Sequence, residues 1–150
     1  MARIPPVIPW VAALLALSLL LSASPAALAP EGSEDGAEVL RGTWLREYSE
    51  QGFHVRRILA LAPDGSFHET VRATDPAGQA TEYIHAGTWL YDGTNLKRKY
   101  TSMNGRPPSR LNLPFATFQI AFESRNEFLG MDHIHRNQVR YRRVPAETQP

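Results

Sequence analysis

The chain has 150 residues, with 16 basic and 15 acidic side chains and no cysteine. This length allows one domain plus a targeting segment. The lack of cysteine excludes a disulfide framework, a thiolate metal site, a lipoprotein anchor and a cysteine nucleophile, so a folded domain must be stable through its core alone.

The first 29 residues are typical of a secretory signal peptide. Arg3 supplies the positive charge, residues 7–21 are almost entirely apolar, and small residues follow. Cleavage is expected after Ala26 or Ala29, although a proline would follow the second position and has no N–H. An uncleaved anchor is the alternative, but the apolar segment is short beside the roughly 20 residues of a typical span. The cleaved protein would be periplasmic or secreted, with no transmembrane span.

Charge is unevenly distributed along the chain. Residues 31–92 carry five arginines and eleven acidic residues, whereas residues 93–150 carry ten basic and four acidic residues. On an exported protein, a basic surface favours a protein partner or an anionic envelope component over nucleic acid. Because the strands of a meander interleave in space, this asymmetry need not produce a basic patch.

Residues 30–39 are polar and acidic, which predicts a disordered linker. From Leu40, short segments with period-two alternation are separated by turn residues, and Pro63-Asp64-Gly65 is typical of a hairpin turn. No convincing helix follows the signal segment. Strands are predicted at 42–48, 53–61, 66–73, 81–91, 95–103, 115–123, 127–134 and 138–144.

Eight short strands with tight turns predict an all-β domain over 40–145, followed by a polar tail at 146–150. A single antiparallel meander of about eight strands would remove its edges by closing into a barrel. One motif occurs twice, as Gly42-Thr43-Trp44 and Gly87-Thr88-Trp89. A glycine before a large aromatic lets two backbones approach while the indole plugs a barrel end. A duplicated half-barrel is another interpretation of this repeat.

These two motifs, with Ala62-Pro63-Asp64-Gly65-Ser66-Phe67 and Tyr141-Arg142-Arg143-Val144, resemble bacterial exported lipocalin-like domains of uncharacterised function. The resemblance covers most of residues 40–144 and implies an eight-stranded barrel with an internal cavity. Avidin-type barrels also open with Gly-Thr-Trp and are an alternative. A lipocalin usually adds a C-terminal helix where this chain has a polar tail, and the departure argues against a large closed lipid cup.

Several charged residues fall on strand faces that are predicted to point inward. Alternate residues of a strand share a face, and an unpaired charge inside a protein needs a partner or water. The arginines among these residues suit the carboxylate or phosphate head of an amphiphile, because a guanidinium binds such groups at two points. The inward polar residues are Arg46, Arg57, Glu69, His85 and Arg98. The predicted ligand-binding residues are Arg57, Glu69, His85, Trp89, Arg98, Tyr100 and Phe118, with Phe67 and Phe122 as further lining.

The charged residues on the predicted inward faces have other interpretations. The charged residues would be structural if they lay at a barrel mouth or if Arg57 paired with Glu69 across the second hairpin. A register error of one residue would turn them outward. The inward face of each strand is assigned from its apolar residues, which include Trp44, Tyr48, Phe53, Tyr83, Leu129, Met131 and Tyr141. The aromatic residues are expected mainly to fill the core.

His133 and His135 form the sharpest local motif. On one strand both imidazoles would face the same side, as two ligands of a zinc or copper ion would require. His85 is the best candidate for a third ligand, and Asp132 would face the opposite way. The motif is short and common, so the metal site is a minor hypothesis.

No sequence motif predicts a reaction or a cofactor. There is no Gly-x-Ser-x-Gly nucleophile elbow, and an inward Glu69 with His85 is too general a pair to indicate catalysis. The first hypothesis is therefore a small-ligand-binding barrel that is not an enzyme. The alternative is a filled barrel that binds a protein or an anionic envelope component, or has a structural role in the envelope. It would act through the basic C-terminal strands, with Arg136, Arg140, Arg142 and Arg143.

Overall fold

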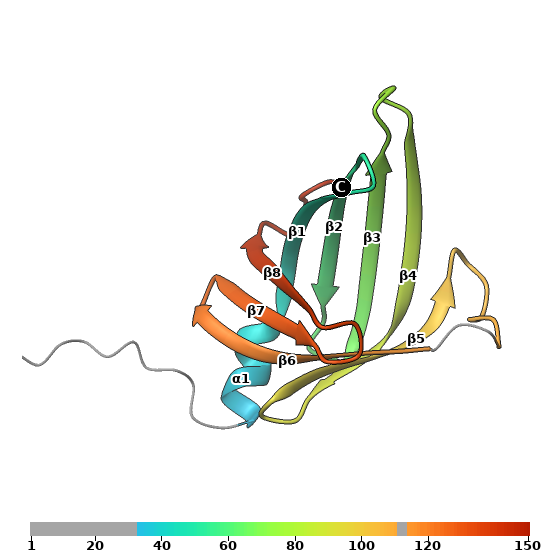
Figure 1. The fold of residues 1–150 in the computed structure, drawn as a ribbon. Helices are drawn as coiled ribbons and strands as arrows, with labels where there is room; N and C mark the ends of the chain where they lie inside the picture. Colours follow the sequence, from blue (N-terminus) through green and yellow to red (C-terminus); the bar gives the residue numbers. More distant parts are fainter. Residues whose placement is uncertain (1–32, 111–113) are drawn as a thin grey trace, which may run out of the picture.

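The chain forms a closed eight-stranded antiparallel barrel with a short helix at one end (Figure 1). The computed structural model describes residues 33–110 and 114–150, so the predicted signal peptide lies outside the described residues. The strands pair in sequence order, and β1 pairs with β8 to close the sheet, which confirms the predicted meander. The elements are α1 (Ser33–Leu40), β1 (Gly42–Glu50), β2 (Phe53–Leu61), β3 (Ser66–Thr74), β4 (Ala80–Tyr91), β5 (Asn95–Met103), β6 (Phe115–Ser124), β7 (Glu127–Asp132) and β8 (Asn137–Val144).

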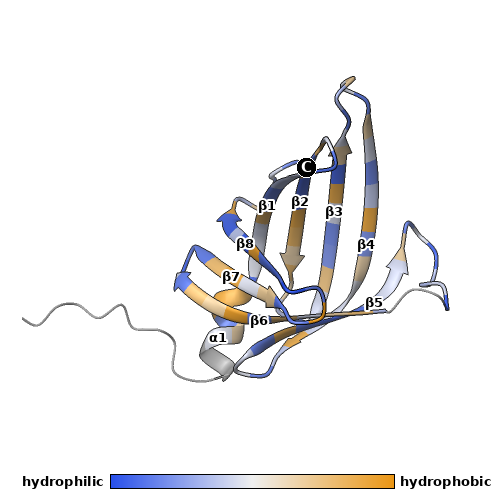
Figure 2. Cartoon of the chain, in the orientation of Figure 1, coloured by the Kyte–Doolittle hydropathy of each residue, from blue (hydrophilic) through white to orange (hydrophobic). Residues whose placement is uncertain are grey.

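The two ends of the barrel differ in what covers them. Helix α1 lies at the end that holds the β2–β3, β4–β5 and β6–β7 turns, which we call the helix end (Figure 1). The β1–β2, β3–β4, β5–β6 and β7–β8 connections gather at the other end, which we call the open end. Apolar and polar residues alternate along the strands, as Figure 2 shows. Within the two described ranges, no helix is long and apolar enough to cross a membrane.

Aromatic side chains fill the helix end. Trp44 is fully buried, its ring lies edge-on to Phe128 at 4.7 Å between centroids, and Phe128 stacks on Tyr141 at 5.1 Å. The indole N–H of Trp44 donates to the carbonyl of Leu40 at 2.7 Å, and that of Trp89 donates to Ala62 at 3.0 Å. Both tryptophans of the repeated motif therefore plug this end, with their polar atoms satisfied.

The repeated motif does not indicate a duplicated half-barrel. Strands β1 and β4, which carry the two copies, run in opposite directions because three antiparallel pairings separate them. A duplication of four strands would relate β1 to β5 instead. The similarity therefore reflects two separate plugs of one barrel end.

The prediction of a disordered linker at 30–39 is wrong for residues 33–39, because Ser33–Leu40 forms helix α1; residues 30–32 lie outside the described residues. Val39 and Leu40 are buried. Gly36 lies so close to strand β4 that an added Cβ would stand 2.4 Å from Cε1 of Tyr91. The segment is polar in composition, but its few apolar residues pack against the barrel. Tertiary packing of this kind stabilises short helices and leaves no trace in composition.

The predicted inner face of β7 is wrong by one residue. Phe128 and Gly130 face the interior, whereas Leu129 and Met131 face outward and are half-buried. The inward face was missed because Gly130 has no apolar side chain to mark it. An added Cβ at Gly130 would lie 3.1 Å from both Phe118 and Val139, so the position faces the core.

Two residues on the predicted inward rows are exposed because the strands extend beyond the core at the open end. Phe53 and Tyr83 are 43% and 41% exposed, respectively. Residue alternation gives the face of a strand but not the height at which the core stops.

The packing of α1 predicts that Leu40→Ala destabilises the barrel. Removal of a fully buried leucine side chain should cost about 2–5 kcal/mol of unfolding free energy. Leu90→Ala is the matched control, since Leu90 is 54% exposed and a surface change of this kind costs about 0.5 kcal/mol or less. Urea unfolding followed by tryptophan fluorescence measures both. Equal midpoints for the two variants would show that α1 is not part of the cooperative fold.

Candidate functional site

Glu69 is the centre of a polar cluster inside the barrel. Its carboxylate is fully buried, and Oε1 accepts a hydrogen bond from Nη1 of Arg98 at 2.9 Å. Oε2 lies 3.2 Å from Nη1 of Arg57 and 3.3 Å from Nδ1 of His85, and it accepts from the Tyr100 hydroxyl at 3.4 Å. These residues lie on four adjacent strands, β2 to β5. One carboxylate therefore connects half of the barrel wall.

The charges of this cluster follow from their mutual contacts. Burial raises the pKa of Glu69, but the charge of Arg98, the hydrogen bond with His85 and the charge of Arg57 together hold that pKa below its ordinary value. Burial lowers the pKa of each arginine, and Glu69 more than compensates. Burial raises the pKa of Tyr100 to about 12. At neutral pH, Glu69 is a carboxylate, both arginines are charged and Tyr100 is neutral.

A third arginine leaves the interior with excess positive charge. Arg46 on β1 is directly opposite Arg57 on β2, and both are half-buried. The guanidinium carbon of Arg46 lies 4.1 Å from the ring centroid of Tyr48, whose hydroxyl accepts from Nη2 of Arg57 at 3.4 Å. None of the ion pairs found within residues 33–110 and 114–150 uses Arg46. Like charges directly opposite on a sheet are destabilising unless something neutralises them.

Several buried donors of the cluster have no acceptor among the residues that the structure describes. They are Nε of Arg57, Nε of Arg98 and the hydroxyl of Tyr141. A buried donor left unpaired costs about 1–3 kcal/mol. An acceptor inside the barrel would satisfy these groups.

Exposure increases steadily from the base of the cluster toward the open end. The exposed fraction of the side chain is 0% for Glu69, 2% for Arg98, 14% for His85 and 22% for Arg57. Arg98 lies between the rings of Phe67, Tyr100 and Phe118, with its guanidinium carbon 5.4–5.7 Å from each centroid. Arg57 is therefore the cationic group that a molecule entering from the open end would meet, and the Arg98–Glu69 pair forms the base.

The predicted ligand-binding residues fall into two groups. Arg57, Glu69, His85, Arg98 and Tyr100 form the cluster, so the Arg57–Glu69 pair raised as a structural alternative does form. Trp89, Phe118 and Phe67 belong to the packed core of the helix end, with Phe122 packed against it. Contact of any of these residues with a ligand stays a prediction. Arg46 was expected on an inward face among the arginines that suit an anionic head, but it was not among the predicted ligand-binding residues. Its opposition to Arg57 follows from the strand register.

The structure does not place His133 and His135 on one strand face, because β7 ends at Asp132 and both histidines lie in the following turn. Nε2 of His133 is 2.7 Å from Oε1 of Gln119, and Nδ1 of His135 is 2.6 Å from Oδ2 of Asp132. The expected separation of Asp132 from the pair is therefore wrong. In the described part of the chain, no group of three or more histidine, aspartate or glutamate side chains is arranged to hold a metal ion.

The arginines of strand β8 are engaged within the chain. Arg140 pairs with Glu123 and Glu127, and Nη2 of Arg142 is 3.2 Å from Oε2 of Glu47. Intramolecular ion pairs therefore neutralise two of the arginines that the sequence suggested for a basic binding face.

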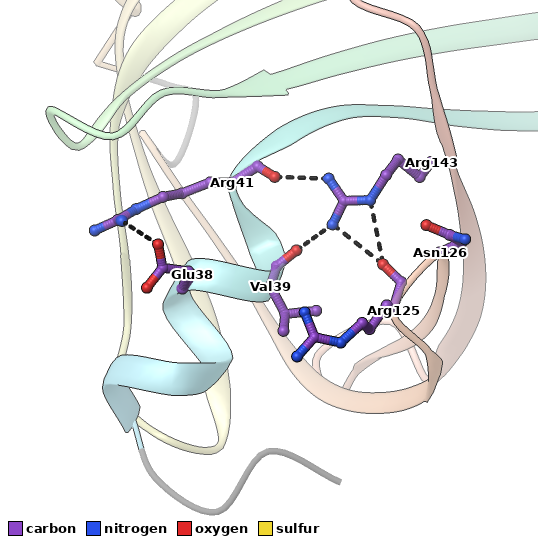
Figure 3. Close-up of a pocket in the computed structure, with 6 residues that line it drawn as sticks. All are labelled: Glu38, Val39, Arg41, Arg125, Asn126 and Arg143. Carbon is purple, nitrogen blue, oxygen red and sulfur yellow. Dashed lines mark hydrogen bonds and ion pairs between the residues drawn. The ribbon is translucent and has the colours of Figure 1, made fainter. Parts of the chain in front are cut away.

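Arg143 borders a pocket of about 240 Å³ outside the barrel, between α1 and the β6–β7 turn (Figure 3). Its guanidinium donates to the carbonyls of Val39, Arg41 and Arg125 and stacks on Trp44 at 4.3 Å from the ring centroid. Its hydrogen-bonding capacity is therefore used to attach helix α1 to the barrel. The pocket therefore lies where α1 is attached to the barrel, and we take the interior cluster as the candidate site.

The Glu69 contacts predict that Glu69→Gln lowers the unfolding free energy by about 3–5 kcal/mol at neutral pH, because it leaves Arg98 charged and unpaired in the core. The folded pKa of Glu69 is depressed, so its stabilisation is complete above its unfolded pKa of about 4.3 and is lost as the pH falls through the folded value. The difference between the two proteins should therefore shrink below about pH 4.3. Urea titrations across this range, with exposed Glu82→Gln as the control, measure it; a pH-independent difference would contradict the assignment.

The chain matches no protein-family model, and no curated protein is significantly similar to it in sequence. The closed eight-stranded barrel is consistent with the lipocalin-like resemblance at the level of fold. The interior cluster and its approach from the open end are therefore the basis for inferring a function.

Proposed function

We propose that this protein is an exported, non-catalytic small-ligand-binding barrel that holds the anionic head of an amphipathic molecule between Arg46 and Arg57. The observation that carries the proposal is the direct opposition of these two arginines above a single buried carboxylate. Arg57 and Arg98 share Glu69, and Arg46 has no ion pair among the residues that the structure describes, so the three arginines and one carboxylate leave two positive charges in excess. A carboxylate, sulfonate or phosphate would neutralise them and accept their unused N–H groups.

The packing of the barrel sets the direction in which such a ligand would lie. The Arg98–Glu69 pair and the aromatic core beneath it fill the helix end. The ligand head would therefore rest on the cluster, and the apolar part would extend toward the open end. Val55, Val71 and Tyr83 lie there on the inner rows of β2, β3 and β4. This short apolar stretch suits a compact amphiphile.

The rival hypothesis, a filled barrel that binds a partner through its basic C-terminal strands, has less support. Arg140 and Arg142 are paired with carboxylates and Arg143 with backbone carbonyls. A partner would have to compete with these contacts. In the interior, one carboxylate faces Arg57 and Arg98, and Arg46 has no ion pair within the described ranges. Periplasmic or secreted localisation, and kinship with lipocalin-like domains, complete the proposal and rest on the signal segment and the barrel motifs.

A pair of fluorescent probes tests the site. 1-Anilinonaphthalene-8-sulfonate carries a sulfonate, and N-phenyl-1-naphthylamine has nearly the same rings without a charge. The sulfonate should bind more tightly, and Arg46→Met should weaken it by roughly ten- to hundredfold, the effect of losing a hydrogen bond to a charged group. Binding of the neutral probe should stay unchanged. Fluorescence titration at low and high salt measures both affinities.

Arg72→Met provides the matched control, because Arg72 lies on the outer face of β3 and is exposed. Arg57→Met should resemble Arg46→Met in binding but also lose stability, since Arg57 contacts Glu69. The proposal is wrong if Arg46→Met binds the sulfonate as tightly as the Arg72→Met control, or if both probes bind the unmodified protein equally. Native mass spectrometry of the purified protein would then identify any ligand that it retains.

A further inference from the structure

Two connections at the open end expose apolar and basic side chains together. Phe115, at the start of β6, is 60% exposed, and Ile134, in the β7–β8 turn, is 76% exposed. Arg106 and Arg110 in the β5–β6 connection and Arg136 in the β7–β8 turn are exposed as well. No ion pair among the residues that the structure describes involves these three arginines. We call these five residues the rim patch.

The strand register places the two parts of the rim patch on neighbouring strands. Gln119 of β6 pairs with Met131 of β7, and His133 in the following turn holds the Gln119 side chain at 2.7 Å. The β7–β8 turn is thereby fixed against β6. Phe115 lies four residues before Gln119, on the same outward row. The exposed phenylalanine and isoleucine therefore border the same side of the open end.

Positive charge dominates this part of the rim. Asp132 is the carboxylate of the β7–β8 turn, and contacts within the turn occupy it. Its Oδ1 accepts the backbone N–H of Ile134 at 2.9 Å and of His135 at 3.2 Å. Its Oδ2 faces Nδ1 of His135 at 2.6 Å. The arginines of the patch are left to interact with an external anion.

We propose that the rim patch docks the open end of the barrel onto a lipid surface that contains anionic lipids. Separate apolar side chains that insert at the headgroup boundary, flanked by arginines, are the features that bind such a surface. A protein partner would need a continuous face of about 800 Å² with an apolar centre. Phe115 and Ile134 instead are exposed singly, one at the start of β6 and the other in the β7–β8 turn.

The docking is argued from the residues of the rim patch alone, and only its use in ligand exchange rests on the proposed function. The open end is also the end toward which Arg57 and His85 become exposed. Docking there would bring the mouth of the barrel to the lipids from which an amphiphile could enter or into which it could leave.

Vesicle co-sedimentation of the purified protein tests the docking. Phosphatidylcholine vesicles with and without phosphatidylglycerol should differ, with tighter binding to the anionic vesicles that weakens as salt increases. The triple variant R106Q/R110Q/R136Q should bind anionic vesicles roughly a hundredfold more weakly, at about fivefold for each arginine. F115S/I134S should also weaken binding. The N-terminal segment is identical in all variants, so a difference in vesicle binding is caused by the substitutions in the rim patch.

Controls at the helix end make the test specific. Leu90→Ser removes an exposed apolar side chain, and Arg125→Gln removes an exposed arginine; neither should change vesicle binding. Affinity for 1-anilinonaphthalene-8-sulfonate should be unchanged in the rim variants, which also verifies their fold. Arg46→Met should lose the probe and keep the vesicles, so the two proposals can fail separately. Docking through the rim patch is overturned if the rim variants sediment with anionic vesicles as the unmodified protein does.

Discussion

The buried carboxylate of Glu69 is the constraint on which the rest of the barrel depends. A charge with no exposed surface is tolerated only when it is paired and hydrogen-bonded, and Glu69 has Arg98, Arg57, His85 and Tyr100 as partners. Those partners lie on β2, β4 and β5, so a slip of one residue in any of these strands would break the set. Hydrophobic residues of similar volume would stabilise the same space at lower cost. The cluster therefore specifies strand register and interior chemistry more than it adds stability.

The cluster also divides the barrel into two parts with different physical properties. Toward α1, the interior is a packed aromatic core, in which Phe128 contacts the rings of both Trp44 and Tyr141. Toward the open end, Val55 and Val71 are buried, whereas Tyr83 and Phe53 are 41% and 43% exposed. The filled part provides the stability that a domain without disulfides requires, and it frees the other part from carrying the core. The two hypotheses drawn from sequence differ in whether the interior is filled, and side chains fill it at the helix end.

Period-two alternation was sufficient to predict the eight strands, the closed meander and the inward position of Glu69, Arg57 and Arg98. It succeeded because the inner and outer faces of these strands differ strongly in polarity. It failed where the inner face lacks an apolar side chain, as at Gly130 in β7, and where a turn begins inside an apolar run, as at His133. Helix α1 was missed because its stability comes from Leu40 and Gly36 packing on the barrel. The cross-strand opposition of Arg46 and Arg57 follows from the register, which alternation alone does not determine.

Structural pairing accounts for Glu69 but not for the number of arginines around it. A single guanidinium would balance the carboxylate, and Arg98 does so at 2.9 Å from a fully buried position. Arg57 adds a second contact, and Arg46 adds a charge that faces Arg57 and has no carboxylate partner among residues 33–110 and 114–150. If the cluster served only the fold, this excess would be a net cost, because like charges repel and their unused donors lose water. An anionic group entering from the open end, as proposed, would turn the same excess into binding energy, which is why the surplus charge is the feature most informative about function.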